Sequence, residues 1–158
     1  MPTFSDFRFT SSTGLNSIYA KKCAPDGAPK AVVQIAHGIV ECIDRYDDFM
    51  MFLAENGIVV VGNDHLGHGK TIQKPEEKGF FANKNGWDYV VEDMLRLHER
   101  TKKEYPDIPY IMFGHSMGSF LTRTYMINYP DKFDMAILSG TGHQGALLVN
   151  AGYAAANL

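Results

Sequence analysis

Apolar residues at the start of the chain fall into short runs whose spacing is typical of β-strands. Phe4, Phe7 and Phe9 lie in a first run, a turn follows at Gly14, and residues 16–24 form a second run. Because a single tight turn joins the two runs, we expect them to pair as antiparallel strands.

After a loop at residues 24–30, which holds two prolines and a glycine, the pattern changes to alternating strands and helices. Short, almost wholly apolar runs have the composition of strands buried on both faces, and they lie at residues 31–36, 58–61, 110–113 and 135–138. Segments with apolar residues at helical spacing lie between them, at residues 45–56, 88–105 and 117–129. This alternation predicts an α/β fold, with a mostly parallel sheet and helices on both faces.

The sequence GHSMG, residues 114–118, lies between a predicted strand and a predicted helix. It matches the pattern GxSxG in the strand–turn–helix setting that a nucleophile elbow requires. A strained turn at Ser116 would push its hydroxyl out of the sheet, and the two glycines leave room for close packing of strand and helix. The Met117 amide would lie at the N-terminus of the helix, where backbone donors stabilise a developing oxyanion. Ser116 is therefore our candidate nucleophile.

A second signal, His37-Gly38-Ile39, directly follows the strand predicted at residues 31–36. Hydrolases with a nucleophile elbow place their other oxyanion donor at this point, and we assign it to the backbone amide of Ile39. The structural alternative is a glycine-lined turn in which Ser116 only caps a helix. The two signals together favour acyl transfer over that alternative.

In these segments the sequence resembles α/β-hydrolases of the monoacylglycerol lipase and lysophospholipase group, which carry the serine aminopeptidase (S33-type) domain. The matching segments are HGIVECIDRY (37–46), NDHLGHGKT (63–71) and FGHSMGSFLTRTYMINYPDKFDMAILSGT (113–141). They keep the order and approximate spacing of the family. Cys42 departs from the pattern, because close lipases usually carry histidine there. We expect Glu41 and Arg45 to brace this loop rather than to take part in chemistry.

The resemblance implies an α/β-hydrolase fold that is truncated before the cap and the last strands. Family members continue beyond the strand at residues 135–138 with a cap, and then with the acid and the histidine of the triad on later strands. Residues 1–158 would be the N-terminal portion of a single α/β-hydrolase domain, with the cap entered at about residue 142. The chain would then supply a nucleophile and an oxyanion hole without the other triad members.

Asp131, Asp134 and His143 follow Ser116 in the chain order of a Ser–Asp–His triad. Both aspartates precede the strand at residues 135–138, so they would lie at its amino end. Ser116 would lie at the opposite edge of the sheet, roughly 17 Å of strand away. No acid is placed to orient His143, and we favour truncation of a longer enzyme over a local dyad.

The histidines near the predicted site have structural as well as functional explanations. We expect His37 to order its own loop and His98 to be partly buried beside a helix, while His115 occupies the variable position of the elbow. His37, His115 and His143 are also our candidates for lining a substrate pocket.

Asp64, His65 and His68 could suggest a metal site, but the leucine and glycine between them fit a loop that hydrogen-bonds to itself. We expect no metal, and an acyl-enzyme mechanism requires no cofactor. Residues 69–71, Gly-Lys-Thr, partly match the phosphate-binding pattern GxxxxGK(S/T). The first glycine of that pattern would be Asp64, whose carboxylate would repel a phosphate, so nucleotide binding is disfavoured.

Composition excludes several classes of protein. The 158 residues suffice for one domain. The 15 basic and 18 acidic side chains give a formal charge of −3, which provides no positively charged surface to attract nucleic acid. Cys23 and Cys42 form no CxxC pattern, so a reducing compartment is the default. The start of the chain lacks signal-peptide features, and no apolar run approaches the ~20 residues of a membrane span. We expect a cytoplasmic domain.

These observations lead to competing functions. The first is a serine carboxylic-ester hydrolase that acts on lipid monoesters, monoacylglycerols or lysophospholipids, through an acyl-enzyme on Ser116. An S33-type peptidase or another esterase is the alternative within that class, because the substrate-selecting cap is absent. A catalytically dead domain that binds an acyl ligand or a partner protein is the alternative from another class, because the triad acid and histidine are absent. For the 158 residues alone, the sequence is compatible with an enzyme and with a catalytically dead binding domain.

The end of the sequence raises two further expectations. An unpaired sheet edge after the strand at residues 135–138 would make the isolated chain prone to aggregate. The apolar tail GALLVNAGYAAANL (145–158) is either the start of a cap helix that makes peripheral contact with a membrane or an amphipathic segment whose partner lies elsewhere.

Overall fold

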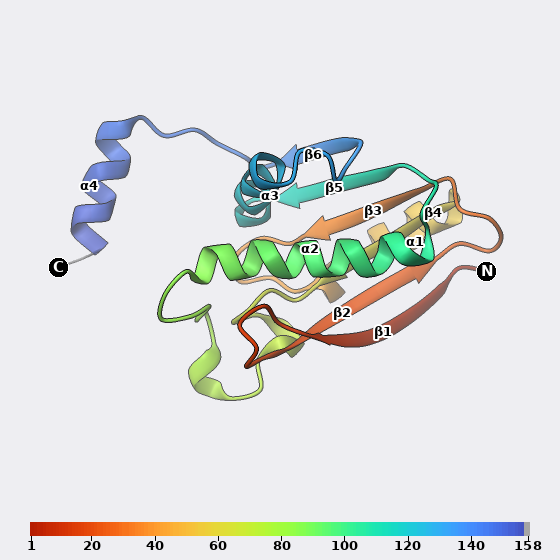
Figure 1. Cartoon of the computed structure of the whole chain (residues 1–158), viewed down its shortest axis with the longest axis horizontal. Helices are drawn as coiled ribbons and strands as arrows, with labels where there is room; N and C mark the ends of the chain where they lie inside the picture. Colours follow the sequence, from red (N-terminus) through yellow and green to blue (C-terminus); the bar gives the residue numbers. More distant parts are fainter. Residues whose placement is uncertain (157–158) are drawn as a thin grey trace.

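The computed structural model describes residues 1–156, in which six strands form one sheet in the order β1-β2-β4-β3-β5-β6 (Figure 1). The strands are β1 (Thr3–Thr10), β2 (Ser17–Ala24), β3 (Ala31–Ala36), β4 (Ile58–Asn63), β5 (Tyr110–His115) and β6 (Met135–Ser139). β1 and β2 pair antiparallel as predicted, and β2 is antiparallel to β4. The neighbours from β4 to β6 are all parallel.

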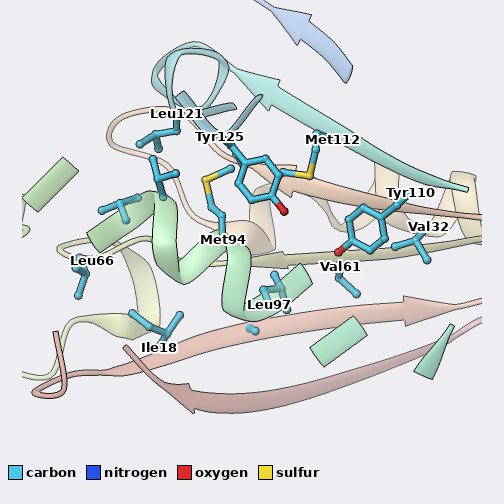
Figure 2. Close-up of a cluster of buried hydrophobic side chains, with 14 of the residues drawn as sticks. Ile18, Val32, Val61, Leu66, Met94, Leu97, Tyr110, Met112, Leu121 and Tyr125 are labelled. Carbon is cyan, nitrogen blue, oxygen red and sulfur yellow. The ribbon is translucent and has the colours of Figure 1, made fainter. Parts of the chain in front are cut away.

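Helices cover the sheet on both faces, which confirms the predicted α/β class. α1 (Asp47–Glu55) packs on one face, and α2 (Gly86–Glu104) and α3 (Met117–Asn128) pack on the other (Figure 1). Alternate residues of β3 supply the two cores, because Val32 faces α2 and α3 whereas Val33 faces α1. Figure 2 shows the larger of these cores, under α2 and α3.

Several element boundaries differ from the predictions for identifiable reasons. β4 and β5 each continue two residues past the predicted ends, because backbone pairing persists after the apolar run stops, as in the pair His115–Ser139. The helix predicted at residues 45–56 is a 3-10 turn, η1 (Ile43–Tyr46), followed by α1. The long loop after β4 contains two further turns, η2 (Gly69–Thr71) and η3 (Pro75–Glu77).

One carboxylate of α2 lies on the buried face, where the pattern places apolar residues. Asp93 accepts hydrogen bonds from the Ser11 hydroxyl at 2.7 Å and from the Ser12 amide at 2.6 Å. Burial raises the pKa of the Asp93 carboxyl, although these bonds act to lower it. The side chain therefore fastens the β1–β2 turn to α2.

The C-terminal part of the described chain is little covered by the rest of the protein. Met135 of β6 is 56% exposed, and α4 (Ala146–Ala156) projects away from the sheet, with Leu147 87% exposed (Figure 1). No helix within residues 1–156 is both long enough and apolar enough to cross a membrane.

Candidate active site

Ser116 lies on a sharp turn between β5 and α3. Its backbone angles are φ 50° and ψ −119°, a conformation that residues other than glycine rarely adopt. The Ser116 amide donates to the carbonyl of Ser139 at 2.9 Å, which ties the turn to the end of β6. The Ser119 amide and hydroxyl both donate to the Ser116 carbonyl, at 2.9 and 2.6 Å, so the first turn of α3 holds the turn from the other side.

The two glycines of the GxSxG motif lie where a side chain would collide with backbone. A Cβ atom at Gly118 would lie 1.9 Å from the carbonyl oxygen of Ala36 at the end of β3. A Cβ atom at Gly114 would lie 2.4 Å from the carbonyl oxygen of Gly118. Close contact of α3 with β3 and β5 therefore requires glycine at both positions, for the reason that the motif predicts.

The loop after β3 lies directly against Ser116. A Cβ atom at Gly38 would be 3.2 Å from the Cβ atom of Ser116. Met117 is the first residue of α3, so its amide lies at a helix N-terminus beside Ser116. Within residues 1–156, neither the Ile39 amide nor the Met117 amide donates a hydrogen bond to another group. The residue before Ile39 thus lies against Ser116, and Met117 directly follows Ser116.

His37 orders its own loop, as predicted. Its side chain is fully buried, its Nδ1 lies 2.8 Å from the carbonyl oxygen of Gly38, and its Nε2 accepts from the amide of His65 at 3.0 Å. Because Nε2 accepts, Nδ1 carries the proton of the neutral ring. Burial lowers the pKa of His37 to about 4, so the imidazole stays neutral near pH 7.

Of the other two histidines proposed for a substrate pocket, His115 is the last residue of β5 and His143 follows β6. His115 is half-buried, with Nδ1 3.1 Å from the hydroxyl of Ser139. His143 is exposed, next to Gly142, whose carbonyl accepts from Arg123 at 2.9 Å.

Asp134 lies at the opposite end of the parallel strands from Ser116, as predicted. Its carboxylate accepts from the Tyr110 amide at 2.7 Å, and its own amide donates to the Tyr110 carbonyl at 2.9 Å. Tyr110 is the first residue of β5, whereas Ser116 follows its last residue. Asp134 is therefore in no position to orient a histidine beside Ser116.

Asp64 organises the loop that follows β4. Its carboxylate accepts from the amides of Ile43 at 2.7 Å and Lys70 at 2.6 Å, which confirms a loop that hydrogen-bonds to itself. Burial raises the pKa of the Asp64 carboxyl despite these bonds. In the described part of the chain, no three His, Cys, Asp or Glu side chains group as a metal site would require. The sequence did not reveal the link from Asp64 back to Ile43.

A pocket of about 680 Å³ lies beside the loop that follows His37. Its lining includes the apolar side chains of Ile39, Val40 and Phe81 together with Cys42 and His68. Ser116 is not among the lining residues, so the pocket adjoins the loop after β3 rather than Ser116 itself.

The chain matches known hydrolases over most of its length. The family described as serine aminopeptidase, S33, matches residues 27–157. Monoglyceride lipase from Rattus norvegicus is 29% identical over 121 residues, which are 77% of this chain and 38% of that protein. Monoacylglycerol lipase from Mycolicibacterium smegmatis is 30% identical over 138 residues, which are 87% of this chain and 47% of that protein.

Solved structures agree with these relatives. A thermostable carboxyl esterase from Bacillus coagulans, in complex with glycerol, superposes with a TM-score of 0.85 at 33% identity and covers 97% of this chain and 51% of its own. The chain thus spans about half, or less, of the length of the proteins that it matches. The chain belongs to the serine aminopeptidase S33 family, and its fold is that of an α/β-hydrolase of the monoacylglycerol lipase and lysophospholipase group.

Proposed function

We propose that this protein is a serine carboxylic-ester hydrolase that acts on lipid monoesters, with Ser116 as the nucleophile. The observation that carries the proposal is the backbone of Ser116, held at φ 50° between β5 and α3 with the Gly38 loop against it. Strained backbone of this kind persists only where surrounding contacts determine it, and it clusters at functional sites.

In the proposed reaction, the Ser116 oxygen attacks the carbonyl carbon of the ester, and the carbonyl oxygen becomes an oxyanion. The Ile39 and Met117 amides donate to that oxyanion. A histidine base takes the hydroxyl proton and passes it to the departing alcohol as the ester C–O bond breaks. Water then hydrolyses the acyl-enzyme. We place this histidine, and the acid that orients it, in the part of the protein that corresponds to the unmatched half of the relatives.

Two observations support lipid monoesters as substrates. Matched relatives are named monoglyceride or monoacylglycerol lipases. The pocket beside the loop after β3 offers the apolar side chains of Ile39, Val40 and Phe81 to an acyl chain, next to the charged side chains of Glu41, Asp44, Arg45 and Lys78.

A fluorophosphonate probe tests the nucleophile in the protein at its natural length. We expect covalent labelling of the wild type and of Ser5→Ala, an exposed serine on β1, and no labelling of Ser116→Ala. A folded wild-type protein that stays unlabelled would contradict the proposal. Hydrolysis of a monoacylglycerol, a lysophospholipid and an amino-acid anilide, compared in one assay, then separates the lipase from the peptidase.

A non-catalytic acyl-binding role is the second candidate. It is favoured by the positions of the local acid and histidine, because Asp134 lies at the far edge of the sheet and His115 Nδ1 faces Ser139. A fluorescent monoacylglycerol analogue that binds wild type and Ser116→Ala equally, without release of fatty acid from either, would identify this role.

A further inference from the structure

The carboxylate of Glu41 lies inside the loop that faces Ser116. One of its oxygens, Oε2, accepts from the Gly38 amide at 2.8 Å and from the Tyr46 hydroxyl at 2.9 Å. The other oxygen, Oε1, lies 3.4 Å from Nε of Arg45. The Glu41 side chain is 14% exposed, so these partners replace most of its water.

The loop that Glu41 closes contains a strained residue. Val40 has φ 58°, a left-handed conformation that is unfavourable for a β-branched side chain. Burial does not compensate this strain, because the Val40 side chain is 86% exposed. Hydrogen bonds within the loop must therefore hold the backbone in this shape, and the bond from the Gly38 amide to Glu41 spans the strained residue.

The same bond determines which amides are free to meet an oxyanion. Gly38 lies against Ser116, but its amide donates to Glu41. An amide has one proton, so Gly38 is removed as a donor and the next amide, that of Ile39, remains. The geometry of the Ile39 amide then depends on the turn between Gly38 and Glu41.

We propose that Glu41 is a positioning residue that fixes the Ile39 amide as an oxyanion donor, by engaging the Gly38 amide and holding Val40 in its left-handed conformation. This proposal rests on the proposed serine hydrolase function. In this role Glu41 acts through the loop backbone, by way of its hydrogen bond with the Gly38 amide. Tyr46 and Arg45 in turn hold the carboxylate in place.

The ionisation states of Glu41 and Tyr46 are consistent with a positioning role for Glu41. Burial alone would raise the pKa of Glu41, but the Gly38 amide, the Tyr46 hydroxyl and the electrostatic interactions with His115 and Arg45 outweigh it and lower the pKa. Burial and the adjacent Glu41 carboxylate raise the pKa of Tyr46, so it stays a hydroxyl donor. Glu41 is thus an acceptor throughout the neutral range.

Ester hydrolysis by variants at position 41 tests the proposal in the protein at its natural length. In Glu41→Ala we expect kcat to fall by about 10- to 100-fold with KM nearly unchanged, because the oxyanion exists only after attack. In Glu41→Gln the amide oxygen still accepts from Gly38, and we expect kcat within about threefold of wild type. Glu55→Ala, an exposed glutamate at the end of α1, is the matched control and retains wild-type kcat. A wild-type kcat in Glu41→Ala, or equal losses in Glu41→Ala and Glu41→Gln, would overturn the proposal.

Amide hydrogen exchange supplies a readout that does not depend on activity. We expect the Gly38 amide to exchange at least ~10-fold faster in Glu41→Ala than in wild type, and at the wild-type rate in Ser116→Ala. A wild type that neither hydrolyses esters nor reacts with the fluorophosphonate would refute the hydrolase function. The Gly38 exchange rate would still test whether Glu41 holds the loop. Unchanged Gly38 exchange in Glu41→Ala would refute the positioning role.

A second variant covers the case in which Glu41→Ala does not fold. Tyr46→Phe removes one donor to the carboxylate and leaves the Gly38 bond in place. We expect a loss in kcat of about threefold together with faster Gly38 exchange. Wild-type kcat and wild-type exchange in this variant would contradict the proposal.

Discussion

Two regions of the molecule differ in how the described chain holds them in place. In the loop region (residues 37–71), Asp64, Glu41 and His37 each hold backbone groups through hydrogen bonds of 3.0 Å or less. In the C-terminal region (residues 135–156), β6 and α4 leave large apolar side chains exposed. The loop region is therefore organised by hydrogen bonds among its own residues, whereas strand β6 at the edge of the sheet and the last helix depend on little of the described chain.

The largest expected difference between the two regions comes from adding one methyl group to a glycine at each of them. Gly118→Ala would press a Cβ atom against the carbonyl oxygens of Ala36 and His37, where the loop region begins, and we expect a loss of at least ~4 kcal/mol in the free energy of unfolding, or no folded protein. Gly142→Ala, with open space around it in the C-terminal region, should change that free energy by less than ~0.5 kcal/mol. Urea unfolding measures both, and similar values for the two would break the comparison.

Two leucines give a smaller contrast of the same kind. Leu66 is buried in the core under α2 and α3, and Leu66→Ala should cost about 3 kcal/mol of unfolding free energy through lost burial and a cavity (Figure 2). Leu147 on α4 is exposed, and Leu147→Ala should cost less than ~0.5 kcal/mol. A large cost at Leu147 would mean that α4 packs in solution against something that it does not contact here.

Acid should weaken the loop region through its buried histidines. Burial lowers the pKa of His37 to about 4 and that of His65 well below its ordinary value. The unfolded chain therefore binds a proton at each of these imidazoles more tightly than the folded chain does. The stability that the neutral histidines contribute is present above pH 6.5 and is lost as the pH falls. From pH 7 to pH 5 we expect a loss of roughly 2 kcal/mol for each such histidine.

Denaturant unfolding at the two pH values checks this expectation. The raised pKa of Asp64 opposes the loss, since a carboxyl protonated more readily in the folded state stabilises it as the pH falls. His65→Asn should flatten the profile relative to wild type, and equal stability of wild type at pH 7 and pH 5 would show the prediction to be wrong.

The features that sequence reasoning predicted are those that depend on local pattern. The bounds of β3 match because every residue of the strand is buried, and the GxSxG turn lies where strand and helix signals meet. Asp93 was not expected in the core, because its partners, Ser11 and Ser12, are about 80 residues away in the sequence. The brace expected of Glu41 was correct, but its Tyr46 partner depends on the path of η1, which no periodicity encodes.

Because the Ser116 amide bonds to β6, the conformation of the turn at Ser116 depends on correct pairing of the last strand. The Ser116 amide finds the Ser139 carbonyl only if β6 pairs with β5 in its present register, with His115 opposite Ser139. A slip of one residue would turn each β6 side chain to the other face and withdraw that carbonyl. A chain in which β6 pairs wrongly would lack this hydrogen bond, so the turn at Ser116 takes its present conformation only where β6 is correctly paired.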